Sequence, residues 1–66
     1  MPLIVFEVGG ELTREQKTDL VQNLTRSSAE ITGIREEAFV IYIHELNEDN
    51  IGLGGKLLTQ VIAERD

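Results

Sequence analysis

The sequence contains no cysteine and no tryptophan, and it has only one proline and one histidine among its 66 residues. The absence of cysteine excludes disulfides and thiolate metal sites. The single His44 offers too few nitrogen ligands for a metal site by itself, so we expect no metal. Basic residues are also scarce, and the resulting net charge of −6 argues against nucleic acid and anionic membranes as partners.

Long apolar runs are absent as well. No stretch approaches the ~20 residues of a membrane span, and the first residues lack the basic and apolar regions of a signal peptide. We therefore expect a cytoplasmic protein. The chain is long enough for one domain, residues 1–66, and a domain of this size buries only ~60% of its unfolded surface. Without disulfides or a metal, oligomerisation is the remaining stabiliser, and the 41% hydrophobic content can supply the interface.

Two short apolar runs predict strands on either side of a helix. Residues 3–8 (LIVFEV) and 38–44 (AFVIYIH) are rich in β-branched and aromatic residues. Between them, Thr13 to Gln16 has the form of a capping box, and Gly33 suits the left-handed position that ends a helix. The apolar stripe of the helix is expected to comprise Leu20, Val21, Leu24 and Ile31.

A strand, a helix and a second strand make a β-α-β unit with parallel strands, so the fold class is α+β. Both strands are apolar on both faces, yet the chain has only one long helix to cover them. The uncovered face predicts assembly with other subunits. Residues 52–55 (GLGG) lack the lysine and hydroxyl of a phosphate loop and favour a tight hairpin or a bulge. The residues that follow fit a short amphipathic helix or a segment that packs on a neighbouring subunit.

Chemistry could lie at Pro2, which follows Met1 directly. Removal of the initiator methionine would leave a terminal secondary amine, whose basicity starts near neutral pH and falls on burial in an apolar site. Taken alone, the pattern also fits a proline that merely begins a strand. His44 could act as an acid or base but also fits a structural role at a strand end, and Tyr42 on the same face fits an interface. The acidic pairs at 36–37 and 48–49 are typical of solvated loops.

Together these features resemble the 4-oxalocrotonate tautomerase family. The matching pieces are Pro2, the segment 15–17 (EQK), the strand end 43–45 (IHE) and the segment 51–55 (IGLGG), at spacings that match without gaps. The resemblance implies two monomers sharing a four-stranded sheet and three such dimers forming a hexamer. It also implies a cofactor-free isomerase that uses Pro2 as general base on a small enol or keto acid, provided that Met1 is absent.

The resemblance also exposes three departures. Family members of the best-known type hold the substrate with two arginines and an aromatic residue, and those positions are occupied here by Leu12, Val40 and Ile51. Apolar side chains offer no charge-assisted hydrogen bonds to a developing oxyanion. Arg14 and Arg35 lie within a few residues of the replaced positions and are possible substitutes, although both also fit ordinary surface arginines.

Three hypotheses follow. The first is a cofactor-free keto-enol tautomerase, with doubtful activity on the family's usual dicarboxylates. The second is a catalytically silent subunit, or one that depends on a paralogous partner to supply the missing arginines in a hetero-oligomer. The third is an unrelated β-α-β module that serves only in oligomerisation.

Overall fold

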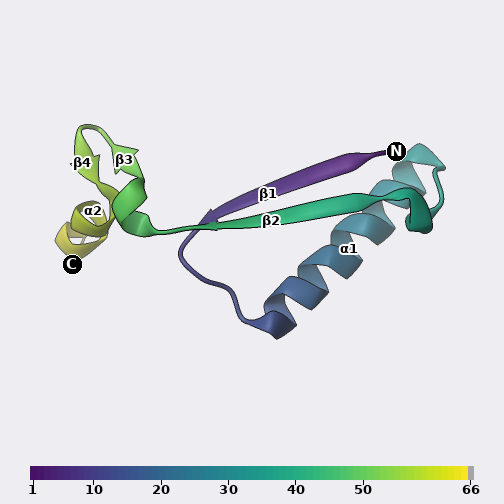
Figure 1. The fold of residues 1–66 in the computed structure, drawn as a ribbon, viewed down its shortest axis with the longest axis horizontal. Helices are drawn as coiled ribbons and strands as arrows, with labels where there is room; N and C mark the ends of the chain where they lie inside the picture. Colours follow the sequence, from purple (N-terminus) through teal and green to yellow (C-terminus); the bar gives the residue numbers. More distant parts are fainter. Residues whose placement is uncertain (66) are drawn as a thin grey trace.

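The computed structural model describes residues 1–65 and shows a β-α-β unit with a smaller carboxyl-terminal unit beyond it (Figure 1). The first unit consists of β1 (Leu3–Gly9), α1 (Arg14–Thr32), the 3₁₀ turn η1 (Glu36–Ala38) and β2 (Val40–Leu46). The second consists of η2 (Glu48–Asn50), β3 (Gly52–Leu53), β4 (Lys56–Leu57) and α2 (Leu58–Glu64). The predicted α+β class, with parallel strands, a hairpin and a short final helix, is confirmed.

Strands β1 and β2 are parallel neighbours, with Leu3 opposite Val40 and Gly9 opposite Leu46. The second strand begins two residues later than the sequence predicted, because residues 36–38 form the turn η1. In β1 the even-numbered side chains, such as Ile4 and Phe6, are half-buried, whereas the odd-numbered ones are exposed. Helix α1 therefore covers one face of the sheet only, as the pattern predicted.

Helix α1 begins and ends where its signals predict. The hydroxyl of Thr13 accepts the Gln16 N–H at 3.0 Å, and the Gln16 side chain accepts the Thr13 N–H at 2.9 Å. At the other end, Gly33 adopts a left-handed φ of 77° and its N–H donates to the Ala29 carbonyl. Two members of the predicted stripe are exposed: Val21 at 37% and Ile31, in the last turn of the helix, at 83%.

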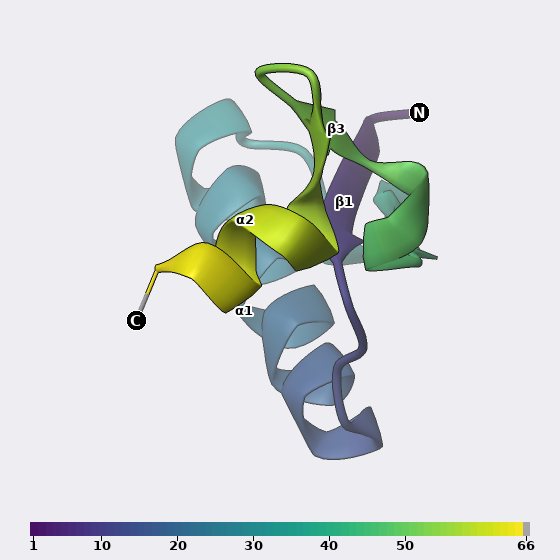
Figure 2. The ribbon, with the colours of Figure 1, turned by 90° about the vertical axis from the view of Figure 1, so that its left-hand side faces the viewer.

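The carboxyl-terminal unit extends beyond the end of the sheet instead of folding back over it (Figures 1 and 2). Its hairpin turns at Gly54 and Gly55, whose φ angles of 62° and 87° are the left-handed values that a tight two-residue turn requires. The N–H of Leu58 donates to the Ile51 carbonyl at 2.8 Å and ties α2 to the hairpin. The glycine cluster is therefore a turn, as predicted.

A single copy has no buried core. None of residues 1–65 is buried, and Leu3, Val5 and Tyr42 on the open sheet face are each more than half exposed. The radius of gyration is 15.4 Å, against about 11 Å for a compact domain of this length. The accessible surface is 5215 Å², against about 4,200 Å² for a folded monomer of this mass. These values fit a subunit of an oligomer, in which neighbouring subunits cover the apolar surface.

Candidate active site

Pro2 lies immediately before β1, at the end of the sheet where both parallel strands start. Its carbonyl oxygen accepts the backbone N–H of Val40 at 3.0 Å, which extends the β1–β2 ladder by one bond. Both residues are half-buried. The structure thus brings together two of the candidate site residues, the terminal proline and the residue at the second arginine position.

Leu12 and Ile51 lie at the opposite end of the sheet. Leu12 is in the loop between β1 and α1, and Ile51 follows η2. The end of β1 closely approaches the Ile51 side chain, since a Cβ built on Gly9 would lie 3.0 Å from Ile51 Cδ1. Both candidates are half-buried.

Within one copy, these two pairs are separated by the length of β1. Seven residues of strand span about 20 Å at the usual rise per residue. Pro2 and Val40 therefore cannot meet Leu12 and Ile51 of the same copy around one small substrate. A site that contains all four residues requires more than one copy of the chain.

The two candidate substitutes lie near the two ends. Arg14 is the first residue of α1, close in sequence to Leu12, and it lines an open hollow on the helix with Lys17 and Val21. Arg35 precedes η1 on the Val40 side; it is 84% exposed and lies 4.0 Å from Glu37. An exposed ion pair at that distance contributes little, so it does not fix Arg35 in place within one copy.

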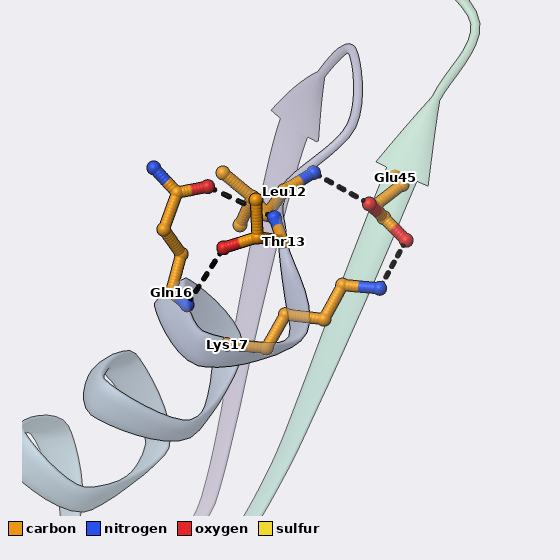
Figure 3. Close-up of polar contacts among 5 residues, drawn as sticks. All are labelled: Leu12, Thr13, Gln16, Lys17 and Glu45. Atoms are coloured by element: carbon orange, nitrogen blue, oxygen red, sulfur yellow. Dashed lines mark hydrogen bonds and ion pairs between the residues drawn. The ribbon is translucent and has the colours of Figure 1, made fainter.

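The structure adds one polar cluster that the sequence analysis did not single out (Figure 3). Glu45 projects from β2 toward α1, and one carboxylate oxygen accepts the Leu12 N–H at 2.7 Å. The other lies 2.6 Å from the ammonium of Lys17. Hydrogen bonding from Lys17, followed by that from Leu12, lowers the pKa of Glu45 below its ordinary value. The sequence held one indication of this cluster: Glu45 shares the helix-facing side of β2 with Ile41 and Ile43, where a carboxylate needs a polar partner.

His44 lies on the open face of the sheet, with its Nδ1 3.6 Å from a carboxylate oxygen of Glu7 and its ring 6.3 Å from that of Tyr42. The His44 side chain is 52% exposed, and it comes from the end of β2 that is remote from Pro2. Within one copy it therefore has no route to a substrate held by Pro2. Its surroundings fit a role on the uncovered face better than an acid or base at the proline.

Within residues 1–65, no group of three or more histidine, cysteine or carboxylate residues is arranged to hold a metal ion. None of the helices in this part of the chain is both long and apolar enough to cross a membrane.

The parallel β-α-β unit, the half-buried proline at the start of β1 and the glycine hairpin define a tautomerase-type subunit. A family model described as "tautomerase enzyme" matches residues 2–61, and the chain belongs to that family. The 2-hydroxymuconate tautomerase of Bacillus subtilis is 34% identical over 61 residues, which cover 92% of this chain and 98% of the relative. The resemblance to 4-oxalocrotonate tautomerases is thereby confirmed.

Solved structures of tautomerases share the fold of this chain. DmpI from Archaeoglobus fulgidus is 36% identical with a TM-score of 0.79, and the match covers 88% of this chain and 98% of that one. A heterohexameric 4-oxalocrotonate tautomerase from Chloroflexus aurantiacus is 20% identical with a TM-score of 0.84, over 92% of this chain and 98% of that one. At that identity the second likeness concerns the fold alone.

Proposed function

We propose that the protein is a cofactor-free keto-enol tautomerase in which the nitrogen of Pro2, freed by removal of Met1, is the general base. One observation carries the proposal: Pro2 is half-buried at the start of β1 and its carbonyl oxygen accepts the Val40 N–H, so the residue is held in place without the use of its nitrogen. The family match also begins at this residue. With Met1 attached, the same nitrogen is an amide and has no usable basicity.

The chemistry needs only one group that both takes and returns a proton. The secondary amine removes the hydroxyl proton of a 2-hydroxydienoate or enol, and the resulting prolinium delivers a proton to a carbon of the same conjugated system. A base is most effective when its pKa lies near the working pH, and a terminal amine starts at about 7.7–8.0. Apolar neighbours disfavour the cation and move the amine closer to neutrality.

The site is completed by other copies of the chain. Because Leu12 and Ile51 lie at the far end of β1, a neighbouring subunit must present them to Pro2 and Val40. The exposed apolar face of the sheet and the absence of a buried core in residues 1–65 support the homohexamer expected from the resemblance. A solved structure of the same fold is a heterohexamer, so a paralogous partner is a related option.

The apolar lining defines the substrate class. Leu12, Val40 and Ile51 carry no donor that could bind a second carboxylate, and the net charge of −6 in each subunit repels anions. We therefore propose a small enol or keto acid with at most one carboxylate. Removing one oxyanion donor costs about 10²–10³ in rate, so catalysis of the family's dicarboxylates is expected to be weak.

The same three residues favour one alternative. A subunit that lacks every donor at the substrate positions could supply its proline, or only its fold, to a hetero-oligomer whose other chain carries the arginines. This alternative differs from the first proposal in one measurable respect, because the isolated chain would then be inactive even with a free Pro2.

Intact-mass measurement on protein from its native host tests the first step, and the proposal requires the loss of Met1. Ketonisation of phenylenolpyruvate and of 2-hydroxymuconate is then measured for the wild type and Pro2→Ala. We expect activity with phenylenolpyruvate that falls by about 10²–10⁴ in the variant, the usual contribution of a general base. Equal rates for the two proteins would reject Pro2 as the base.

A further inference from the structure

The carboxylate of Glu45 joins the loop that carries Leu12 to the sheet and to α1. Glu45 is the second-last residue of β2, and its two oxygens bind two different elements (Figure 3). Oε2 accepts the backbone N–H of Leu12 at 2.7 Å, while Oε1 lies 2.6 Å from Lys17 Nζ in the first turn of α1. Glu45 lies 33 residues after Leu12 and 28 residues after Lys17 in the sequence, so these two contacts join distant parts of the chain.

The backbone N–H groups of Gly10 and Thr13 are bonded independently of Glu45, whereas the N–H of Leu12 depends on it. On one side of it, the N–H of Gly10 donates to the Leu46 carbonyl at 2.8 Å. On the other side, the N–H of Thr13 donates to the Gln16 side chain at 2.9 Å. Within residues 1–65, the Leu12 N–H donates to the Glu45 side chain alone and to no backbone carbonyl.

The charge on Glu45 strengthens that hold. Hydrogen bonds to an ionised acceptor are shorter and stronger than those between neutral groups, and the Glu45 side chain is only 28% exposed. Lys17 compensates the charge of the carboxylate at close range, so the Leu12 N–H has an ionised acceptor that is itself held in place. An open hollow of about 660 Å³ adjoins the cluster and includes Glu45, Gly10 and Glu11 in its lining.

We propose that Glu45 is a positioning residue: through the Leu12 N–H and Lys17, it fixes the Leu12 loop that one subunit presents to the Pro2 of another. The inference rests on the proposed function, because it takes Leu12 as part of the substrate site. Glu45 itself does not touch the reacting atoms. Loss of its carboxylate displaces Leu12, and a displaced residue in the lining of the substrate site weakens the binding of the substrate.

The experiment compares Glu45→Ala, which removes the acceptor, with Glu45→Gln, which retains an oxygen for the Leu12 N–H. The matched control is Glu64→Ala, because Glu64 forms a similar ion pair with Lys56 at 2.8 Å in the carboxyl-terminal unit. Two quantities are measured on the assembled protein: the hydrogen-exchange rate of the Leu12 amide, and KM and kcat for phenylenolpyruvate.

We expect Glu45→Ala to accelerate Leu12 exchange and to raise KM by about tenfold, with kcat changed less than KM. Glu45→Gln should restore most of both quantities, and Glu64→Ala should change neither. Equal KM values for Glu45→Ala and the wild type, or a Glu45→Gln variant as impaired as Glu45→Ala, would overturn the role of Glu45. An inactive wild type with a free Pro2 would instead overturn the proposed activity of the isolated chain, and the positioning role with it.

Discussion

The backbone N–H of Val40 donates to the carbonyl oxygen of Pro2 at 3.0 Å, so the two parallel strands start side by side. This bond fixes the proline through the atom that is not needed for chemistry. Whether the nitrogen carries a methionine or is free makes no difference to the bond. The structure therefore separates the fold, which tolerates either terminus, from the proposed base, which requires one of them.

The first prediction uses that separation. Protein carrying an uncleaved extension before Pro2 should fold and assemble as the processed protein does, because the bond between Pro2 and Val40 is unchanged. Its ketonisation rate should nevertheless fall by about 10²–10⁴, since the proline nitrogen is then an amide. Circular dichroism and light scattering check the fold and the assembly. A fully active extended protein would show that the base lies elsewhere.

The second prediction concerns a hydrogen-bond donor restored at Leu12, the first of the replaced arginine positions. Leu12→Arg should raise kcat/KM for 2-hydroxymuconate by about tenfold or more, because a guanidinium supplies charge-assisted hydrogen bonds that leucine lacks. The control is Leu53→Arg, which adds the same charge at a hairpin residue that is 58% exposed. An equal gain in both variants would mean that net charge alone limits the reaction.

Periodicity was sufficient to predict the architecture. The capping box at Thr13, the left-handed Gly33 and the two apolar strands depend on local physics, and each is present as expected. The failure at Ile31 has a different cause. The helical spacing places this residue on the stripe, but whether a residue in the last turn finds cover depends on what packs against that turn, and in a single copy it remains 83% exposed.

The candidate site was less accessible to sequence reasoning. The resemblance identified Pro2, Leu12, Val40 and Ile51 as positions, but only the structure shows that they form two pairs at opposite ends of β1. The contact between Glu45 and the Leu12 N–H was missed because it joins a side chain to a backbone group 33 residues away. No local pattern encodes such a contact, although a carboxylate on the helix-facing side of a strand indicates that it needs a partner.

The third prediction concerns the close approach at the end of β1. Gly9→Ala would place its Cβ 3.0 Å from Ile51 Cδ1 and 3.2 Å from Leu58 Cδ2. Overpacking of this kind typically costs about 1–3 kcal/mol, and the mobile ends of these side chains favour the lower part of that range. The free energy of unfolding should fall accordingly in chemical denaturation. Gly52→Ala is the control, because its Cβ would meet only the Lys56 carbonyl at 3.9 Å.

The fourth prediction follows from the lowered pKa of Glu45, whose ordinary value is 4.5. Because the folded state holds this carboxylate ionised, its contribution to stability is present above pH 4.5 and is lost as the pH falls through the lowered value. Glu45→Gln should therefore unfold with a weaker dependence on pH below 4.5 than the wild type. Glu37→Gln makes the same charge change at a side chain that is 76% exposed. If the two variants have the same acid profile, Lys17 and Leu12 do not hold the Glu45 carboxylate ionised.

The last prediction tests the open face of the sheet. Val5 and Tyr42 face each other across the strands and are 51% and 53% exposed in one copy. If subunits cover this face, Val5→Lys places an ammonium against an apolar neighbour, and an unpaired buried charge is strongly unfavourable. The variant should therefore shift from hexamer to smaller species in light scattering.

The melting temperature of Val5→Lys should also depend more steeply on protein concentration, since a dissociating oligomer is stabilised by mass action. Gln22→Lys, at an exposed position of α1, adds the same charge and should leave the hexamer intact. A wild type that remains a stable monomer would contradict the assembly on which the composite site depends.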